Sequence, residues 1–331
     1  MTDQPLVSVV TVYYNRVGHV REAMQSLFDQ TEKNIEIIAA DDGSTDGTGA
    51  ALEALDDPRL IVRRHENMGF VAAVNAAIRS SRGKYVAIHG SGDISQPQRL
   101  AKQAAILEAR PEIGLVGCWI ENEDLVGQAL ELKKPTDDMP LREEILKRNP
   151  FTHGEVMYRR DLFDKVGGYR EFFRFAQDRD LWVRMSRHTD HAVVPEVLYR
   201  RKRLAGGVST TAEKLILQGM LSEFAVHCGR EVAAGRPDPL ERTGPSAGLL
   251  RTRSASLAGR FARVGIKMLA IEETQNAEKL IAAARNEHPN LPIVRVASAL
   301  LSASRMGAVW SRVLRPSVRR GLELRTGPIG G

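Results

Sequence analysis

Cysteine is scarce in this chain, since Cys118 and Cys228 are the only two among 331 residues. Two thiols so far apart give neither a disulfide framework nor a zinc-binding spacing. No stretch approaches the roughly 20 apolar residues that a membrane-spanning helix needs. The first residues, Met1 to Pro5, lack the basic and apolar segments of a secretory signal. We therefore expect a protein of the reducing cytoplasm, with at most peripheral membrane contact.

Acidic residues are scarce in the last part of the chain. Residues 241–331 contain 15 Lys and Arg against 6 Asp and Glu, whereas residues 1–240 contain 32 against 35. The basic excess therefore belongs to the C-terminal segment, where it suits an anionic membrane surface or an acidic partner. Basic residues are not interleaved with stacking aromatics, so we expect no nucleic-acid binding.

The first 120 residues alternate between β-branched runs and helical spacing of apolar residues. Strands are expected over 6–12, 35–42, 60–62, 85–88 and 113–120, and helices over about 20–28, 50–55, 70–80 and 97–109. This alternation predicts an α/β fold, with a Rossmann-like, mainly parallel sheet flanked by helices and right-handed crossovers.

The pattern divides the chain into two regions. We expect one domain over 1–209, in which the alternation holds to about residue 120 and breaks over about 121–209, where an α/β domain would add the elements for a second substrate. Residues 210–331 are mainly helical in pattern and form a basic C-terminal extension. Within it, residues 291–315 read as an amphipathic helix whose apolar arc holds Ile293, Val296, Leu300, Trp310 and Leu314. This helix either packs on the rest of the protein or lies on anionic lipid.

One stretch, residues 35–48, stands out as a buried strand that ends in two carboxylates. Asp41 and Asp42 are followed by Gly43, which permits a sharp turn, and by three residues that cap helices well. Ligands of open parallel sheets bind at the carboxyl ends of strands. The pair is therefore either a capped turn with solvated acids or a pair of acceptors for a bound nucleoside.

Further short motifs follow in a fixed order along the chain. They are Val9 to Arg16, Asp41 to Asp46, Asn67 to Phe70 with Asn75, Ser91 to Asp93 with Pro97, Gly167 to Arg170, and Gln177 to Arg184. Together these segments resemble the family 2 glycosyltransferases, which have the GT-A nucleotide-sugar fold. The resemblance covers about residues 6–209. It implies an inverting transfer from a nucleotide-diphosphate sugar to a hydroxyl of a glycan, a lipid-linked acceptor or a small molecule.

The resemblance assigns the donor side to the ends of the first strands. It implies that Thr11, Tyr13 and Asn15 line the nucleotide base, and that Asp42, with Asp41 beside it, accepts from the base or ribose. Asn67 lies in a loop that the family uses near the nucleotide. Each has a structural alternative, which is a buried strand for the first group and a helix-entry turn for Asn67. Val74 stands where the family often has Arg.

The resemblance also implies Mg²⁺ or Mn²⁺ on the donor diphosphate, held by an Asp-Xaa-Asp-Asp run. Here Gly90, Ser91, Gly92 and Asp93 stand at those positions, so Asp93 alone is left to hold a metal ion near the diphosphate, with Ser91 beside it. In the alternative, basic side chains neutralise the diphosphate, and Lys202 and Arg203 are the candidates.

Asp178 is the catalytic candidate, because inverting transfer needs a general base for the acceptor hydroxyl. The family usually has Glu-Asp where this chain has Gln177-Asp178. The alternative is that Asp178 and Asp180 only cap a helix; Asp180 is expected to anchor the helix or an Arg.

On the acceptor side, Trp182 is expected in the core or at the edge of the acceptor site. His153 is a candidate contact for the acceptor or a phosphate.

Two rival functions remain open. One is a nucleotide-sugar-binding protein that has lost turnover, a hypothesis supported by Gly90, Gly92 and Gln177. The other is a nucleotidyltransferase, which shares the sheet. That class has a Gly-rich, basic loop directly after the first strand, and Tyr13 to Arg16 is not such a loop.

Overall fold

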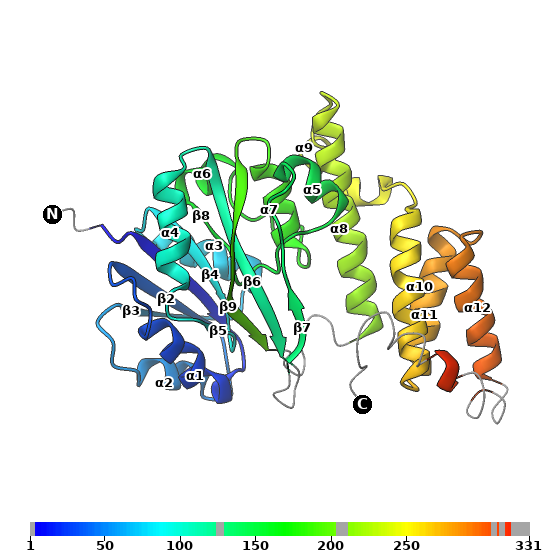
Figure 1. Cartoon of the computed structure of the whole chain (residues 1–331), viewed down its shortest axis with the longest axis horizontal. Helices are drawn as coiled ribbons and strands as arrows, with labels where there is room; N and C mark the ends of the chain where they lie inside the picture. The colour runs from blue at the N-terminus through cyan, green and yellow to red at the C-terminus, as the bar shows by residue number, and fades with distance from the viewer. Residues whose placement is uncertain (1–3, 124–128, 203–210, 306–309, 311–314, 319–331) are drawn as a thin grey trace. The chain divides into compact units, whose positions relative to one another are not determined.

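The computed structural model describes residues 4–123, 129–202, 211–305, 310 and 315–318 (Figure 1). Contacts between residues divide the chain into two compact units, Met1–Ala205 and Gly206–Gly331. The sequence pattern placed the change at residue 209. Each unit has its own hydrophobic core, so each is described by itself.

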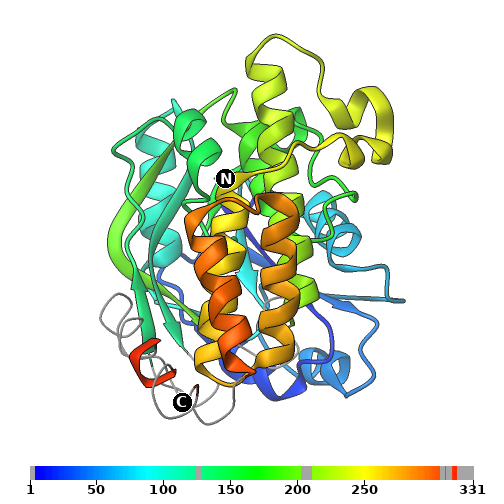
Figure 2. The same cartoon turned by 90° about the vertical axis from the view of Figure 1, so that its right-hand side faces the viewer.

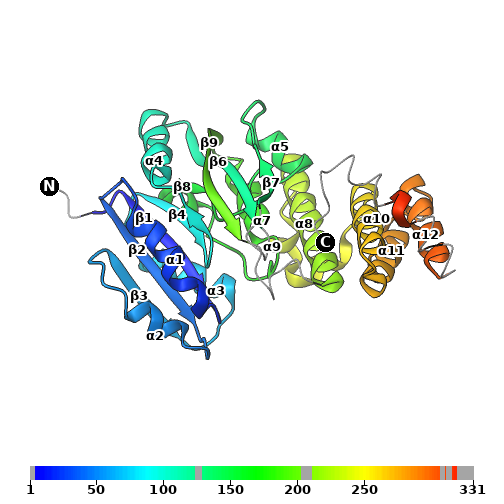
Figure 3. The ribbon, with the colours of Figure 1, turned by 60° about the horizontal axis from the view of Figure 1, so that its bottom comes forward.

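The first half of unit 1 follows the expected alternation. Its strands are β1 (Val7–Tyr13), β2 (Ile35–Asp42), β3 (Leu60–His65) and β4 (Tyr85–Gly90), and its helices are α1 (Val17–Phe28), α2 (Thr48–Glu53), α3 (Phe70–Ser80) and α4 (Arg99–Ala109). The four strands are parallel and lie in the order β3-β2-β1-β4. Figure 3 shows β1, β2 and β3 side by side, with α1 over them. Their carboxyl ends therefore meet at one edge.

The second half of the sheet is mixed rather than parallel. Strand β8 (Met157–Arg159) lies between β4 and β6 (Ile113–Glu123) and is antiparallel to both. Beyond β6 come β9 (Asp190–Lys202), which is parallel to β6, and the short β5 (Ile94–Ser95), while β7 (Ala129–Lys133) pairs with β6. The expectation of a mainly parallel sheet is confirmed, but β6 does not lie beside β4, because a three-residue strand is inserted between them.

Helices cover both faces of the sheet. On one face, apolar residues of α1, α2 and α4 pack on alternate residues of β1 and β2, such as Val9 and Ile37. On the other face lie α3, α5 (Leu141–Lys147), α6 (Arg160–Lys165) and α7 (Gln177–Met185), packed on residues such as Val10 and Ile38. Since side chains alternate along a strand, each buried strand contributes to both cores.

Unit 2 is helical, as the pattern predicts. Its helices are α8 (Ala212–Ala233), α9 (Pro239–Thr243), α10 (Ala255–Ala270), α11 (Thr274–Glu287) and α12 (Pro292–Ser304), with a 3₁₀ helix over Gly244–Leu250. Figure 2 shows α10, α11 and α12 side by side, and their apolar residues form one core. None of the helices in the described part of the chain is both long enough and apolar enough to cross a bilayer.

The amphipathic helix expected over 291–315 is shorter than expected and buries a different face. Helix α12 ends at Ser304, and its buried residues are Val294, Ala297 and Leu301, whereas Val296 is 51% exposed. The expected arc containing Val296 is therefore wrong, because packing against α10 and α11 selects a different face. Trp310 is buried in the same core, and Leu314 lies outside the described residues. The apolar side of α12 is thus covered by its own unit.

Candidate active site

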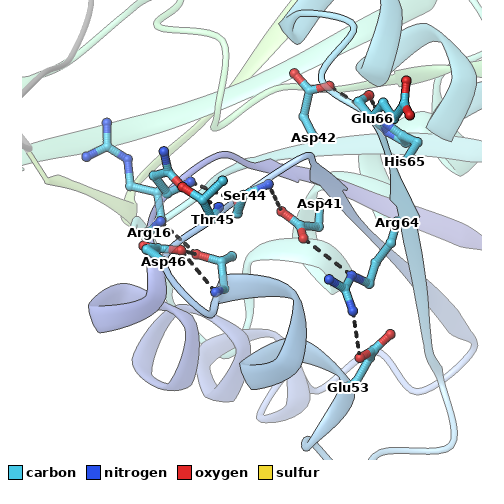
Figure 4. Close-up of polar contacts among 12 residues, drawn as sticks. Arg16, Asp41, Asp42, Ser44, Thr45, Asp46, Glu53, Arg64, His65 and Glu66 are labelled. Carbon is cyan, nitrogen blue, oxygen red and sulfur yellow. Dashed lines mark hydrogen bonds and ion pairs between the residues drawn. The ribbon is translucent and has the colours of Figure 1, made fainter.

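A cavity of about 510 Å³ lies at the carboxyl ends of β2 and β3. The residues that line it come from the loops after these two strands: Asp41, Gly43, Ser44, Arg64, His65, Glu66 and Asn67. Figure 4 shows the side chains of Asp41 and Asp42 leaving β2 on opposite sides, as the alternation of a strand requires. Of the two acids, Asp41 is the one that lines the cavity.

Asp41 is held from two sides, although it is almost completely buried. Its Oδ1 accepts a hydrogen bond from the Ser44 amide at 3.1 Å, and its Oδ2 lies 3.6 Å from Nε of Arg64. Arg64 in turn contacts Glu53 of α2 at 3.2 Å. A cation and a backbone amide thus compensate the burial of this carboxylate.

Asp42 anchors the loop before α3. Its Oδ1 accepts from the Met68 amide at 2.8 Å and its Oδ2 from the Gly69 amide at 3.1 Å. The side-chain Nδ2 of Asn67 donates to the backbone carbonyl oxygen of Asp42 at 2.8 Å. His65 lies on the same carboxylate, with Nδ1 3.4 Å from Oδ1. Asp42 and Asn67, expected at the nucleotide, here shape the wall of the cavity.

The loop after β1 is joined to the loop after β2. Asn15 adopts a left-handed conformation (φ 51°). Its backbone N–H donates to Ser44 Oγ at 2.9 Å, and its side-chain Oδ1 accepts from the Thr45 backbone N–H at 2.8 Å. The Arg16 amide donates to Oγ1 of Thr48 at 2.8 Å. These contacts place Asn15 beside the cavity as a residue that fixes its rim.

Thr11 and Tyr13 do not line the cavity. Both side chains are buried, with 1% and 0% exposure, and Tyr13 belongs to the core under α1. Burial raises the pKa of the Tyr13 hydroxyl well above its ordinary value. The expectation that these side chains contact a base is therefore wrong. Tyr14, the next residue along the chain, is 51% exposed.

Asp93 joins the turn after β4 to the end of β9. Its Oδ2 accepts from the Tyr199 hydroxyl at 2.7 Å, and its Oδ1 accepts from the Lys202 amide at 2.9 Å. The Gly90 amide donates to the same Tyr199 oxygen at 2.9 Å. Burial raises the pKa of the Asp93 carboxyl, and these two hydrogen bonds and the charges of Arg201 and Arg99 oppose that rise.

The residues around Asp93 do not fit the divalent cation that the resemblance implies. At a diphosphate, Mg²⁺ is usually held by one or two carboxylates together with the phosphate oxygens, and of the run Gly90 to Asp93 only Asp93, already hydrogen-bonded to Tyr199 and Lys202, is an acid. Within the described ranges, no group of three or more His, Cys, Asp or Glu side chains is placed to hold a metal ion. We therefore assign no step of the reaction to a metal ion.

The other residues expected near the diphosphate are Lys202, Ser91 and Arg203, and they differ in their surroundings. Lys202 meets Asp93 through its backbone, while its Nζ lies 2.6 Å from Glu22 of α1. Burial and the charges of Arg16 and Lys202 lower the pKa of His19 on α1. Arg16 and Lys202 therefore both lie near the start of α1. Ser91 is partly exposed in the turn, and Arg203 lies outside the described residues.

Asp178 begins helix α7 and is partly exposed. Its Oδ2 accepts from Nδ2 of Asn149 at 2.9 Å, whose Oδ1 in turn accepts from the Phe151 amide at 3.3 Å. Asn149 is thereby fixed in orientation and presents its amide to the carboxylate. The other Asp178 oxygen has no such donor among the contacts described.

His153 connects Asp178 to the nucleotide side. It is held in a left-handed conformation (φ 89°), its Nε2 lies 2.7 Å from the Tyr169 hydroxyl, and its ring meets that of Phe70 edge-on at 5.8 Å. Phe70 follows the loop that Asp42 anchors. Burial lowers the pKa of His153, and the Asp178 charge opposes the shift. These contacts bring Asp178 to the same edge of the sheet as the cavity.

Asp180 has the anchoring role that the sequence predicts. It is completely buried and forms ion pairs with Arg170 and with Arg184, the latter at 2.8 Å. Trp182, two residues on, is also completely buried and packs against Phe151 and Tyr158. The expectation that Trp182 edges the acceptor site is wrong; the structure gives it the core position.

Comparison with known proteins agrees with this geometry. The model of glycosyl transferase family 2 matches residues 8–167. The putative glycosyltransferase EpsE of Bacillus subtilis (strain 168) is 32% identical over 190 residues, covering 56% of this chain and 68% of EpsE. The chain belongs to glycosyltransferase family 2. The amylovoran biosynthesis glycosyltransferase AmsE of Erwinia amylovora is 28% identical over 204 residues, 59% of this chain and 75% of AmsE.

Solved structures of this family share the fold. The 1–349 fragment of S. aureus TarS superimposes with a TM-score of 0.53 at 17% identity, covering 95% of this chain and 91% of the fragment. The mannosyltransferase PcManGT from Pyrobaculum calidifontis gives a TM-score of 0.53 at 20% identity, covering 96% and 83%. The expected GT-A fold is confirmed, and the enzyme is a glycosyltransferase.

Several residues of this family 2 site were missed at the sequence level. Arg64, His65 and Glu66 line the cavity because β3 runs three residues beyond the apolar triplet 60–62. Asn149 and Tyr199 hold Asp178 and Asp93 from 29 and 106 residues away in the chain. Only the polar end of β3 left a readable signal, namely charged residues directly after an apolar run.

Proposed function

We propose that this family 2 enzyme moves a sugar from a nucleoside-diphosphate sugar to a hydroxyl group, with inversion at the anomeric carbon and Asp178 as general base. The proposal combines a polar cavity at the carboxyl ends of β2 and β3 with a partly exposed carboxylate at the same edge. The cavity would hold the nucleoside, and Asp178 would face the acceptor.

The donor class is supported by the cavity and by relatives. Carboxylate, amide and imidazole groups of Asp41, Asn67 and His65 offer partners for the ring N–H and hydroxyl groups of a nucleoside. Nε2 of His65 is buried and has no hydrogen-bond partner within the described structure. TarS has been solved with UDP-GlcNAc, and PcManGT with GDP-Man and Mn²⁺.

One observation carries the choice of base. Of the aspartates at this edge, Asp41, Asp42, Asp93 and Asp180 each have both carboxylate oxygens engaged by amides, hydroxyls or cations. Asp178 has one oxygen held by Asn149 and the other available. A general base needs this arrangement, with an orienting contact on one oxygen and an unshared lone pair on the other.

The chemistry then follows a single displacement. Asp178 takes the proton of the acceptor hydroxyl as its oxygen attacks the anomeric carbon, and the bond to the nucleoside diphosphate breaks on the opposite side. The proton ends on Asp178 and the negative charge on the leaving diphosphate. General base catalysis of this kind contributes about 10²- to 10⁴-fold to the rate.

The acceptor we propose is a glycan or a lipid-linked glycan, in line with the amylovoran biosynthesis assigned to AmsE. Because the apolar side of α12 is buried in its own unit, any membrane contact would be made by basic side chains rather than by insertion of this helix. Co-sedimentation with anionic and with neutral vesicles tests this contact, and binding that ignores lipid charge would contradict it.

Calorimetric titration with UDP, GDP and dTDP tests the donor class. We expect one diphosphate to bind more tightly than the others, and Asp41→Asn to weaken that binding by about tenfold or more, since a buried polar partner is lost. Asp164→Asn, at an exposed aspartate of α6, is the matched control and should bind as the wild type does. Absence of binding by all three diphosphates would refute the proposed function.

A further inference from the structure

Members of this family are expected to hold the donor diphosphate through a divalent cation, and the turn after β4 disagrees with that expectation. We propose that this enzyme binds the donor diphosphate without a divalent cation, and that basic side chains at the end of β9, Lys202 foremost, neutralise it. The inference rests on the proposed function and names how that same site recognises its ligand.

A side chain at position 90 would disturb the contact that holds Asp93. A Cβ added to Gly90 would lie 2.2 Å from Asp93 Oδ2 and 3.3 Å from the Tyr199 hydroxyl oxygen. Real Cβ atoms essentially never come so close to another heavy atom. An acidic residue here would therefore displace the Asp93 carboxylate from the hydroxyl that holds it, so the glycine belongs to the Asp93–Tyr199 contact.

Position 92 is closed to a carboxylate for a different reason. Gly92 has φ +112°, a backbone conformation that residues with a Cβ rarely adopt. Two of the three positions where the family resemblance implies metal-binding acids are therefore occupied by glycines on which the local geometry depends, and Asp93 holds the third. The turn is built as a metal-free turn rather than as a metal site that has lost its ligands.

Asp93, the acid that remains, links the turn after β4 to the end of β9 by hydrogen bonds. Its two oxygens accept from the Tyr199 hydroxyl and the Lys202 amide, which closes the β4–β5 turn onto the end of β9. A metal ion here would have a single carboxylate ligand, with no second acid beside it in the turn Gly90 to Asp93. The two hydrogen bonds of Asp93 also fix the position of the basic end of β9.

The hydrogen bond from the Lys202 amide to Asp93 fixes the position of Lys202 at the end of β9. Its side chain is 18% exposed and makes an ion pair with Glu22, whose own side chain is 64% exposed. Because Glu22 is largely exposed, solvent screens this ion pair, and the ammonium group can exchange this partner for a phosphate. Arg201 precedes it, and Arg16 contributes its charge to the same surroundings.

The test is calorimetric titration of the full chain with UDP, GDP and dTDP, each in Mn²⁺, in Mg²⁺ and in EDTA. The dissociation constant of the diphosphate that binds best should agree within about twofold in the three conditions. A loss of about tenfold or more in EDTA would overturn the inference while leaving the proposed function standing. No binding in any condition would refute both.

Substitutions test the role of Lys202. Lys202→Ala should weaken diphosphate binding about tenfold and binding of the corresponding nucleoside much less, because only the diphosphate carries the charge. Lys102→Ala is the matched control, since Lys102 also pairs with a half-exposed glutamate, Glu196, and lies away from the turn. Equal binding by the two variants would overturn the assignment to Lys202.

Discussion

Asn149 is the residue on which the orientation of Asp178 depends. Its Nδ2 lies 2.9 Å from Asp178 Oδ2, and its Oδ1 is fixed by the Phe151 amide. Without this contact the carboxylate can turn away from the acceptor. Asn149→Ala should therefore lower kcat about tenfold. Asn149→Asp should lower it at least as much, because a second carboxylate at this distance repels the first.

The measurement is steady-state kinetics together with calorimetric binding of the preferred nucleoside diphosphate. Binding should stay within about twofold of the wild type in both variants, because Asn149 does not line the cavity. Asn290→Ala, at an exposed asparagine, is the control and should leave kcat unchanged. A wild-type kcat in Asn149→Asp would contradict the orienting role.

His89 should make the enzyme sensitive to acid. It is buried on β4, and desolvation, together with the nearby Arg99 charge, lowers its pKa from 6.5 to about 3. Between these values the unfolded chain binds a proton that the folded chain does not. Stability is therefore lost as pH falls from 6.5 toward 3, by up to about 1.4 kcal/mol per pH unit.

The measurement is urea unfolding at several pH values across this window. His89→Asn should flatten the pH dependence of the free energy of unfolding, whatever its effect on stability at neutral pH. His288→Asn, at an exposed histidine, should keep the wild-type slope. A wild-type slope in His89→Asn would show that another group causes the acid sensitivity.

At the residue scale the sequence predicts which side chains gather at the edge better than what each one touches. Asp178 could be singled out because its neighbours in the chain form a motif. Its partner Asn149 could not, since 29 residues separate them. Tyr13 was assigned to the nucleotide base by the family resemblance, whereas strand β1 includes Tyr13 and the side chain lies in the core.

At the scale of elements, helix α2 supports the cavity through Gly49. A Cβ on Gly49 would lie 2.4 Å from Asp41 Oδ2 and 2.6 Å from Arg64 Nε. Gly49→Ala should therefore push these side chains apart and weaken nucleoside diphosphate binding several-fold. Calorimetric titration of the variant with the best-binding diphosphate measures this.

Gly18→Ala on α1 provides the matched comparison. Nothing lies within 4 Å of a Cβ at Gly18, which has ordinary helical surroundings. Its replacement should leave binding unchanged and stabilise the helix by about 0.5–1 kcal/mol. If both alanine variants bind the diphosphate as the wild type does, close packing of α2 on Asp41 is not needed for the site.

The elements that sequence predicts well are those with a long, repeated pattern. The β1–α1–β2 alternation and helix α3 appear within three residues of the expected bounds, because burial on both faces leaves unbroken apolar runs. Strand β8 has only three residues, too few for any periodicity, and its insertion between β4 and β6 depends on pairing with both. The antiparallel pairing of β8 with its two neighbours was therefore missed.

At the scale of the whole molecule, the site and both sheet cores belong to unit 1. Residues 1–205 alone should therefore fold cooperatively and bind the preferred nucleoside diphosphate within about threefold of the full chain. Urea unfolding and calorimetric titration of this fragment measure both properties. A fragment that remains unfolded would show that residues 206–331 are needed for the catalytic core.

The change of composition near residue 209 lies close to the boundary that the contacts give after Ala205. Sequence also predicts helices beyond it, because apolar residues recur there at helical spacing. It could not predict which face of α12 is buried, since that face is selected by α10 and α11 rather than by α12 alone.

The most direct test is the release of nucleoside diphosphate from UDP-, GDP- and dTDP-sugars by the wild type, Asp178→Asn and Asp164→Asn, with binding measured on the same samples. We expect Asp178→Asn to bind the preferred diphosphate as the wild type does but to turn over about 10²- to 10⁴-fold more slowly, with Asp164→Asn unchanged. Wild-type turnover by Asp178→Asn would contradict the account. Binding without turnover by the wild type would mean that this chain binds nucleotide sugars without transferring them.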